Sequence, residues 1–353
     1  MEPPDSRRRL KSPRPQPAAP KAGKARPRLG LYAPFAALAV AILAWSLGWF
    51  WLRDEVYRRM DAAARSWEDA GYRIDWATRS VSGYPFRLDV DLTGARLRET
   101  SGWALAAARL KAEAFVFAPD HWVVVAPAGV VLARRVGGPL VVGARVLRAS
   151  LSEGAAHPPR LSVEGLDLIF TAPSWAEPFG LASARELHLH ARAGPRDQGA
   201  AYAELDGART SGPGPLADIA GGAPLTLVAD GVFSHAGALG GRGFAGALRA
   251  WTAAGGSIDI RRLSVDAGKT ELDSRAGSLA IGADGRLAGV IDLTILGGPR
   301  LISTLGEHNS VPAEAATVVL SSSGIGPAAV TLNFQAGQTT LGPVALGPSP
   351  RID

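Results

Sequence analysis

The chain contains no cysteine, so no disulfide bond can stabilise its fold. Any exported part must therefore depend on its own hydrophobic core. About 300 residues follow the first hydrophobic segment, which is enough to bury such a core. We expect a folded body that is stable without cross-links.

Catalytic motifs are also missing. The Gly-x-Ser-x-Gly elbow of the α/β-hydrolases does not occur. The glycine-rich stretch Gly237–Gly246 (GALGGRGFAG) lacks the Gly-Lys-Ser/Thr of a phosphate loop and the strand–helix frame of a dinucleotide site. We therefore expect a protein that is not an enzyme and that holds no cofactor.

Acidic residues are scarce in residues 1–28, where two of them face nine lysines and arginines. This excess is larger than the net charge of the whole chain, which is +6, so the remainder is about neutral. A nucleic-acid-binding body is not expected. The Pro-, Ala-, Lys- and Arg-rich composition predicts a disordered basic cytoplasmic tail over residues 1–28, suited to contact with anionic lipid headgroups.

One long hydrophobic run is present. Leu29–Leu52 carries no charged residue, and a helix needs about 20 apolar residues to cross a bilayer. Tyr32 near one end and Trp45, Trp49 and Trp51 near the other suit the two membrane interfaces. The sequence predicts a transmembrane helix over residues 29–52.

The basic flank gives this helix a direction. Because Lys and Arg stay on the cytoplasmic side, the N-terminus should be cytoplasmic and the chain after Arg53 should be exported. A cleaved signal peptide is the alternative, but it has a shorter apolar region, of about 7–15 residues, and small residues at its cleavage site. Here the run ends in Gly-Trp-Phe-Trp-Leu. The valine-rich His121–Leu132 is too short for a second span and predicts a buried strand pair.

Residues 53–71 are predicted to form a juxtamembrane helix. Val56, Met60, Ala63 and Trp67 make an apolar stripe at three- and four-residue steps, and Gly71 is suited to the C-terminal cap. The stripe is expected to pack on the domain that follows. A rigid stalk or a dimerising helix is the alternative.

Residues 72–353 read as an exported β-rich domain. Within Ser80–Leu92, the residues Phe86, Leu88, Val90 and Leu92 alternate with charged ones, which is typical of an antiparallel sheet with one dry face. The Asp-Gly step in 282–285 predicts a hairpin. The fold class is therefore mainly β, a long antiparallel, curved sheet with one or two packed helices. Further strands are predicted in 103–105, 108–117, 140–151, 160–170, 184–191, 257–266, 269–272, 278–281, 286–296, 317–322, 328–334 and 339–346, and helical pieces in 215–231, 243–252 and 299–305.

Three segments carry a family resemblance: 79–91 (RSVSGYPFRLDVD), 101–103 (SGW) and 115–122 (FVFAPDHW). Together with the anchor, they resemble the uncharacterised bacterial family catalogued as domain of unknown function 2125. The resemblance implies a bacterial inner-membrane protein that faces the periplasm, and it brings no known reaction. More loosely, Gly277–Leu296 is similar to the AsmA-like envelope proteins, in which a curved sheet with an apolar concave face is linked to lipid transport.

Three groups of side chains are candidate sites. Tyr84 and Phe86 in the Gly-Tyr-Pro-Phe string either fill the core or contact a ligand or partner. His188 and His190 share a strand face with Glu186, which makes half a metal site, and a solvated face is the preferred interpretation, so no metal is expected. Asp120 and His121 are ordinary strand residues unless a cleft surrounds them.

These observations favour a non-enzymatic, membrane-anchored envelope protein. Its apolar sheet face would bind lipid or another hydrophobic ligand, and the bilayer itself would be its constant partner. A scaffold for an inner-membrane complex, reached through the helix over residues 53–71, is the alternative. An enzyme acting on envelope glycans or lipids is a further one.

Overall fold

The computed structural model describes residues 29–240, 243–296 and 327–352. The predicted tail over 1–28, the helical piece 299–305 and the strand 317–322 lie outside the described residues. The chain forms two compact units, Met1–Leu47 and Gly48–Asp353. The second unit contains the sheet.

Helix α1 runs without interruption from Leu29 to Asp69. The first half is apolar enough to cross a membrane, and Phe35, Leu43 and Leu47 are each at least 60% exposed. From Gly48 onward the helix belongs to the second compact unit. Gly71 follows just after its end, and the φ of +85° at this residue is readily adopted only by glycine, as expected for the cap.

All the strands that follow belong to one sheet, and every pairing within it is antiparallel. This confirms the mainly β fold class. The strands are β1 Tyr72–Asp75, β2 Thr78–Ser82, β3 Arg87–Glu99, β4 Ala104–Phe115, β5 Ala118–Val125, β6 Val130–Arg134, β7 Gly138–Gly143, β8 Val146–Ser152, β9 Arg160–Thr171, β10 Leu181–Ala193, β11 Gly199–Thr210, β12 Leu225–Phe233, β13 Ser257–Ala267, β14 Thr270–Ile281, β15 Leu287–Leu296, β16 Ala328–Gln335, β17 Gln338–Leu341 and β18 Val344–Pro348.

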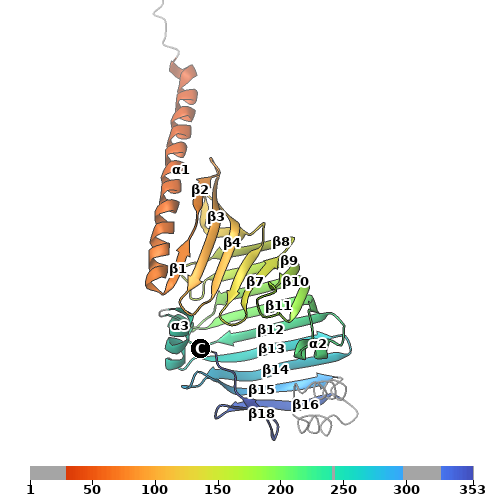
Figure 1. Cartoon of the computed structure of the whole chain (residues 1–353). Helices are drawn as coiled ribbons and strands as arrows, with labels where there is room; N and C mark the ends of the chain where they lie inside the picture. Colours follow the sequence, from red (N-terminus) through yellow and green to blue (C-terminus); the bar gives the residue numbers. More distant parts are fainter. Residues whose placement is uncertain (1–28, 241–242, 297–326, 353) are drawn as a thin grey trace, which may run out of the picture. The chain divides into compact units, whose positions relative to one another are not determined.

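The sheet is a meander, and from β8 to β18 each strand pairs with the next one along the chain. Strands β1 and β2 both pair with β3, β5 and β6 both pair with β4, and β7 and β8 both pair with β9, so each of these couples is one interrupted strand. Figure 1 shows β3 and β4 running at a steep angle to β12–β15, as the cumulative twist of a long sheet requires. A sheet twisted in this way is curved, and the face on the inside of the curve is called the inner face below.

Helices cover parts of the apolar face. The second half of α1 packs Trp49 against Leu88 and Val90 of β3. Helix α2 (Pro215–Ala220) packs on a core that includes Leu168 and Leu225, both almost fully buried. Helix α3 (Gly243–Ala253) buries Trp251, whose Nε1 donates to the Ser234 carbonyl at 2.7 Å. A short 3-10 turn, η1 (Ala236–Ala238), precedes α3.

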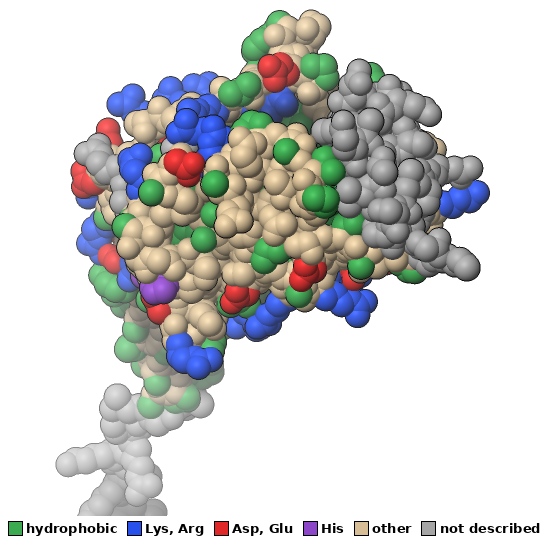
Figure 2. All heavy atoms as spheres, turned by 90° about the horizontal axis from the view of Figure 1, so that it is seen from below, with side chains coloured by type: hydrophobic (Ala, Val, Ile, Leu, Met, Phe, Trp, Pro, Cys, Tyr) green, Lys and Arg blue, Asp and Glu red, His purple; other side chains and the backbone are tan. Residues whose placement is uncertain are grey.

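The other face carries charged side chains that pair across strands. Arg109 Nε donates to Asp91 at 3.0 Å, Arg148 Nε donates to Glu164 at 2.7 Å, and Arg87 pairs with Glu113. Figure 2, which views the molecule from below, shows basic and acidic side chains intermixed around the margin of that end. Exposed pairs of this kind keep the face soluble and add little stability.

Several sequence predictions of single elements are wrong in detail. Ser80–Leu92 is a hairpin and not one strand, because Gly83, with φ of +102°, reverses the chain between β2 and β3. The strands in His121–Leu132 lie end to end on β4 and do not pair with each other. Residues 215–231 hold α2 and also β12, and β11 was not predicted. The helix over 243–252 and the hairpin around 282–285 are confirmed.

Candidate functional site

An apolar groove crosses the inner face of the sheet from β9 to β15. It has a volume of about 480 Å³. That is within the range of about 300–1,000 Å³ found for ligand pockets. Its apolar lining residues are Leu161, Leu189, Ala191, Ala201, Ala203, Ala229, Gly231, Phe233, Ile258, Ile260, Leu263, Leu279 and Ile291, and His190, Tyr202, Asp230 and Arg262 also border it.

Strand register makes this groove continuous. Directly paired residues form one row across eight strands, β9 to β16: Leu161, Ala191, Ala201, Gly231, Ile260, Gly277, Ile291 and Leu332. A neighbouring row joins Val163, Leu189, Ala203, Ala229 and Leu263. Because side chains alternate between faces, every member of a row points to the same side.

The hollow arises from the size of these side chains. In β10, β11 and β12 the two rows carry Ala191, Ala201, Ala203, Ala229 and Gly231, which rise little above the backbone. Larger side chains flank this floor, and Leu161, Leu189 and Ile258 each remain 37% exposed. Small residues between large ones on a twisted sheet give a trough, and a trough lined this way prefers an apolar ligand.

Three smaller apolar hollows follow the groove in a series, and each shares lining residues with the one before it. A hollow of about 300 Å³ beside α3 shares Phe233, Ile258 and Leu279 with it. Through Phe244, that hollow adjoins one of about 340 Å³, which in turn shares Leu97 and Leu105 with a hollow of about 260 Å³ beside α1. The apolar surface is therefore contiguous from α1 to β15.

Beyond the α1 hollow, helix α1 itself occupies the apolar face. Leu52, Val56, Tyr57 and Met60 pack against the core of Trp49, Val81, Leu88 and Val90. Tyr57 accepts a hydrogen bond from the Val81 backbone N–H at 3.0 Å, which fixes the helix to β2. The predicted stripe on the juxtamembrane segment thus packs on the domain through Val56 and Met60, while Trp67 lies 43% exposed against Tyr72.

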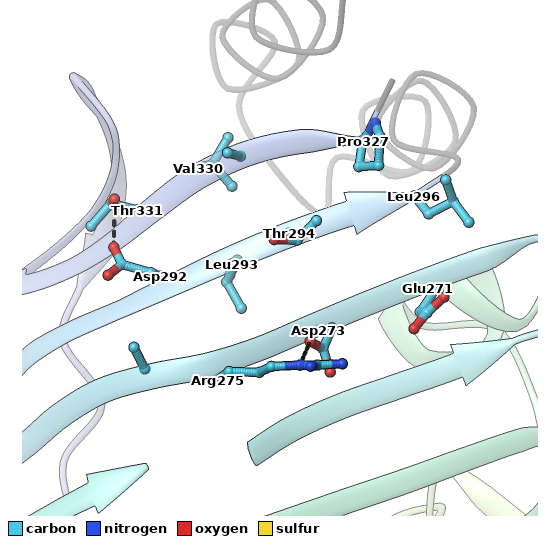
Figure 3. A pocket seen from close by; sticks show the side chains of 12 residues that line it. Glu271, Asp273, Arg275, Asp292, Leu293, Thr294, Leu296, Pro327, Val330 and Thr331 are labelled. Atoms are coloured by element: carbon cyan, nitrogen blue, oxygen red, sulfur yellow. Dashed lines mark hydrogen bonds and ion pairs between the residues drawn. The ribbon is translucent and has the colours of Figure 1, made fainter. Parts of the chain in front are cut away.

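A second, polar hollow of about 650 Å³ lies among β14, β15 and β16 (Figure 3). Two of its carboxylates have partners inside the hollow, because Asp273 accepts from Arg275 Nε at 3.1 Å and Asp292 accepts from Thr331 Oγ1 at 2.9 Å. Glu271 also lines it. Because the apolar groove is continuous with further apolar surface, we take it as the stronger candidate.

Tyr84 and Phe86 lie in the turn between β2 and β3, away from the groove lining. The Tyr84 ring stacks on Phe50 of α1 with centroids 6.3 Å apart and meets Trp49 edge-on at 5.5 Å. Tyr84 is 48% exposed and Phe86 is 59% exposed. Their use as core filling is therefore wrong, and contact with a ligand or partner stays a prediction.

His188 and His190 lie on the polar face, stacked with ring centroids 6.3 Å apart. His188 Nε2 is 3.3 Å from Glu186, and His190 Nδ1 is 2.8 Å from Ser162 Oγ. Nearby, Tyr202 donates to Glu204 at 2.7 Å, which together with burial raises the pKa of Tyr202 above its usual value. In the part of the chain that the structure describes, no group of three or more His, Asp or Glu is arranged to hold a metal ion.

Sequence reasoning missed the groove floor. Strand β11 (GAAYAELDGART) and the segment 229–231 of β12 are rich in alanine and glycine, which have low strand propensity. The available signal was the alternation of Ala201, Ala203 and Leu205 with polar residues. Recognising it requires the register of three neighbouring strands.

Asp120 and His121 are exposed on β5 and are not among the residues that line the groove.

Comparison with known proteins shows the family of the chain. A family model described as "Uncharacterized protein conserved in bacteria (DUF2125)" matches residues 49–350. No curated protein and no solved structure matches the chain. The comparisons do not show the looser similarity to the AsmA-like proteins.

Proposed function

The chain belongs to the DUF2125 family of bacterial proteins, and from this premise we propose that it is a membrane-anchored, non-enzymatic envelope protein that binds the acyl chain of a lipid in its apolar groove. The observation that carries the proposal is the uninterrupted apolar row from Leu161 to Leu332. Mass spectrometry of the crosslinked ligand identifies the class of lipid.

The groove is long enough for this ligand. It crosses seven strands, and strands lie about 4.8 Å apart, so it extends for about 29 Å. One leaflet of a hydrocarbon core about 30 Å thick holds chains about 15 Å long. A whole acyl chain fits across the floor, where burial of apolar area favours binding by about 25 cal/mol per Å².

The first half of α1 supports the proposed anchoring. The large apolar side chains between Phe35 and Leu47 are exposed. Their contact with water is unfavourable, and a hydrocarbon environment would remove it. The basic flank before Leu29 favours a cytoplasmic N-terminus, which would place the groove in the periplasm. An inner-membrane site supplies lipid directly beside the protein.

Photo-crosslinking of the full chain in cells tests the ligand. Ala229, exposed in the groove floor, is replaced by a photoreactive phenylalanine analogue, and Asp259, exposed on the opposite face of the adjacent strand β13, is the matched control. We expect mass spectrometry to find a lipid adduct at position 229 and none at 259. Absence of lipid at 229, or equal labelling at both positions, would contradict the proposal.

A scaffold role for the juxtamembrane helix is the second candidate. The inward side of this helix is occupied by the sheet, and its outer side carries Glu55 paired with Arg58 and Arg59 at 2.7 and 2.8 Å. A protein adduct at Trp67, which is partly exposed, would favour the scaffold role.

A further inference from the structure

We propose that two hairpin turns at one end of the sheet form an aromatic pad that inserts into the interfacial layer of the membrane. The pad consists of Tyr84 and Phe86 in the β2–β3 turn, and of Phe115 and Phe117 at the β4–β5 turn. The proposal rests on the membrane anchoring in the proposed function and is independent of the ligand in the groove.

The pad is exposed and internally ordered. Phe115 is 52% exposed and Phe117 is 74% exposed, and their rings stack with centroids 5.1 Å apart. The Val116 backbone N–H donates to the Phe86 carbonyl at 3.0 Å, which ties the two turns together. Four large aromatic side chains grouped on neighbouring turns form an apolar patch, and such patches mark interaction sites.

The pad adjoins the part of α1 where a membrane span would end. About 20 helical residues cross the hydrocarbon core. Counted from Leu29, which follows Arg28, such a span ends at Gly48. Tyr84 packs on the next two residues, Trp49 and Phe50, so the pad lies at the level of the interface.

The chemistry of the pad also suits this layer. Tyrosine and tryptophan are enriched at membrane–water interfaces, where one end of the side chain is apolar and the other is wet. Arg53 lies over the Phe50 ring at 5.2 Å, so a cation stands beside the pad at headgroup depth. A single helix leaves a domain free to rotate about the helix axis, and a second membrane contact removes that freedom.

Because the chain has no cysteine, single labels test the pad cleanly. The full chain carries an environment-sensitive fluorophore at Phe117→Cys, in liposomes of phosphatidylcholine and phosphatidylglycerol at high dilution. Trp175→Cys is the matched control for exposure to water, since Trp175 lies in a loop and is 75% exposed. Leu43→Cys shows whether the first half of α1 lies in the bilayer. Quenching by iodide in water and by spin-labelled lipid is measured for each.

We expect the label at 117 to be severalfold less quenched by iodide than the label at 175, and severalfold more quenched by spin-labelled lipid. Iodide quenching at 117 equal to that at 175, with the label at 43 protected, would overturn the pad and leave the anchor intact. An accessible label at 43 would overturn both. Protection at 117 that rises with the protein-to-lipid ratio would assign the pad to a second copy of the chain and overturn its insertion in lipid.

Discussion

Arg79 is the side chain that joins helix α1 to β2. Its guanidinium makes a two-pronged contact with Asp61 of α1, with N–O distances of 2.5 and 3.0 Å. It also lies over the rings of Tyr57 at 5.1 Å and Trp76 at 5.3 Å. A planar cation with two carboxylate bonds and two aromatic neighbours is well ordered, so this pair contributes more specificity than a mobile surface pair.

The Asp61–Arg79 pair gives stability a pH dependence. The hydrogen bonds from Arg79 lower the pKa of Asp61 below its usual value near 3.9. A carboxyl with a depressed folded-state pKa stabilises the fold above its unfolded-state pKa, and this contribution is lost as the pH falls through the folded-state pKa.

We therefore expect Asp61→Asn to lower the Tm of the full chain at neutral pH, and the difference from the parent to shrink below about pH 3.9. Asp54→Asn is the control, because Asp54 bonds to the adjacent Arg53 within α1. Thermal unfolding followed by tryptophan fluorescence measures both. A Tm difference that stays constant down to low pH would count against the pair.

The second half of helix α1 acts as a cover for the first strands. Leu88 of β3 is 1% exposed beneath it, and Trp49 Nε1 donates to the Arg87 carbonyl at 2.9 Å. Since the apolar face of β2–β4 has this helix on it, the helix is part of the domain core and not only a tether. A soluble body cut at Arg53 would lose Trp49 and expose Leu88.

Truncating the Leu88 side chain tests whether the second half of α1 and β3 share a core. Leu88→Ala should lower the free energy of unfolding by about 2–5 kcal/mol, because it removes a buried side chain and leaves a cavity. Leu296→Ala, at a position 47% exposed, should change it by less than about 0.5 kcal/mol. Denaturant unfolding in detergent micelles measures both, and equal effects of the two substitutions would contradict a core beneath α1.

Across the molecule as a whole, charge is distributed unevenly. The tail over residues 1–28 has seven more basic than acidic residues, while the remainder is about neutral and its charged face carries paired ions. This asymmetry is the basis for the predicted orientation of the helix and for the expectation that the body does not bind nucleic acid.

Single-cysteine labelling in cells tests this orientation. We expect Trp175→Cys to react with a membrane-impermeant maleimide in cells whose outer membrane is permeabilised, and Ser12→Cys to react only after lysis. Leu43→Cys is the control for burial in the bilayer. Labelling of position 12 in unlysed cells, with protection of position 175, would reverse the topology and remove the groove from the periplasm.

Much of the fold was predictable because its causes are local. Two patterns of adjacent residues gave correct predictions. The period-two alternation at Leu88, Val90 and Leu92 predicted a strand, and the Asp284-Gly285 step predicted a hairpin. The Ala-rich β11 was missed, since its strand conformation is imposed by pairing with β10 and β12 and not by propensity. Phe86 was assigned to the core face, and the turn at Gly83 exposes it.

By itself, the sequence determined that this chain has one apolar helix at its start, a basic flank before it and a long antiparallel body with one dry face. Those features depend on composition and on the spacing of neighbouring residues. Only the tertiary structure decided where that dry face is covered and where it is open. Alanines and glycines from β10, β11 and β12 make a groove because strand register brings them into the same rows, and α1 closes the first strands because its stripe meets Leu88 and Val90 across a turn of the chain. Both arrangements join residues far apart in sequence, so no local pattern can specify them.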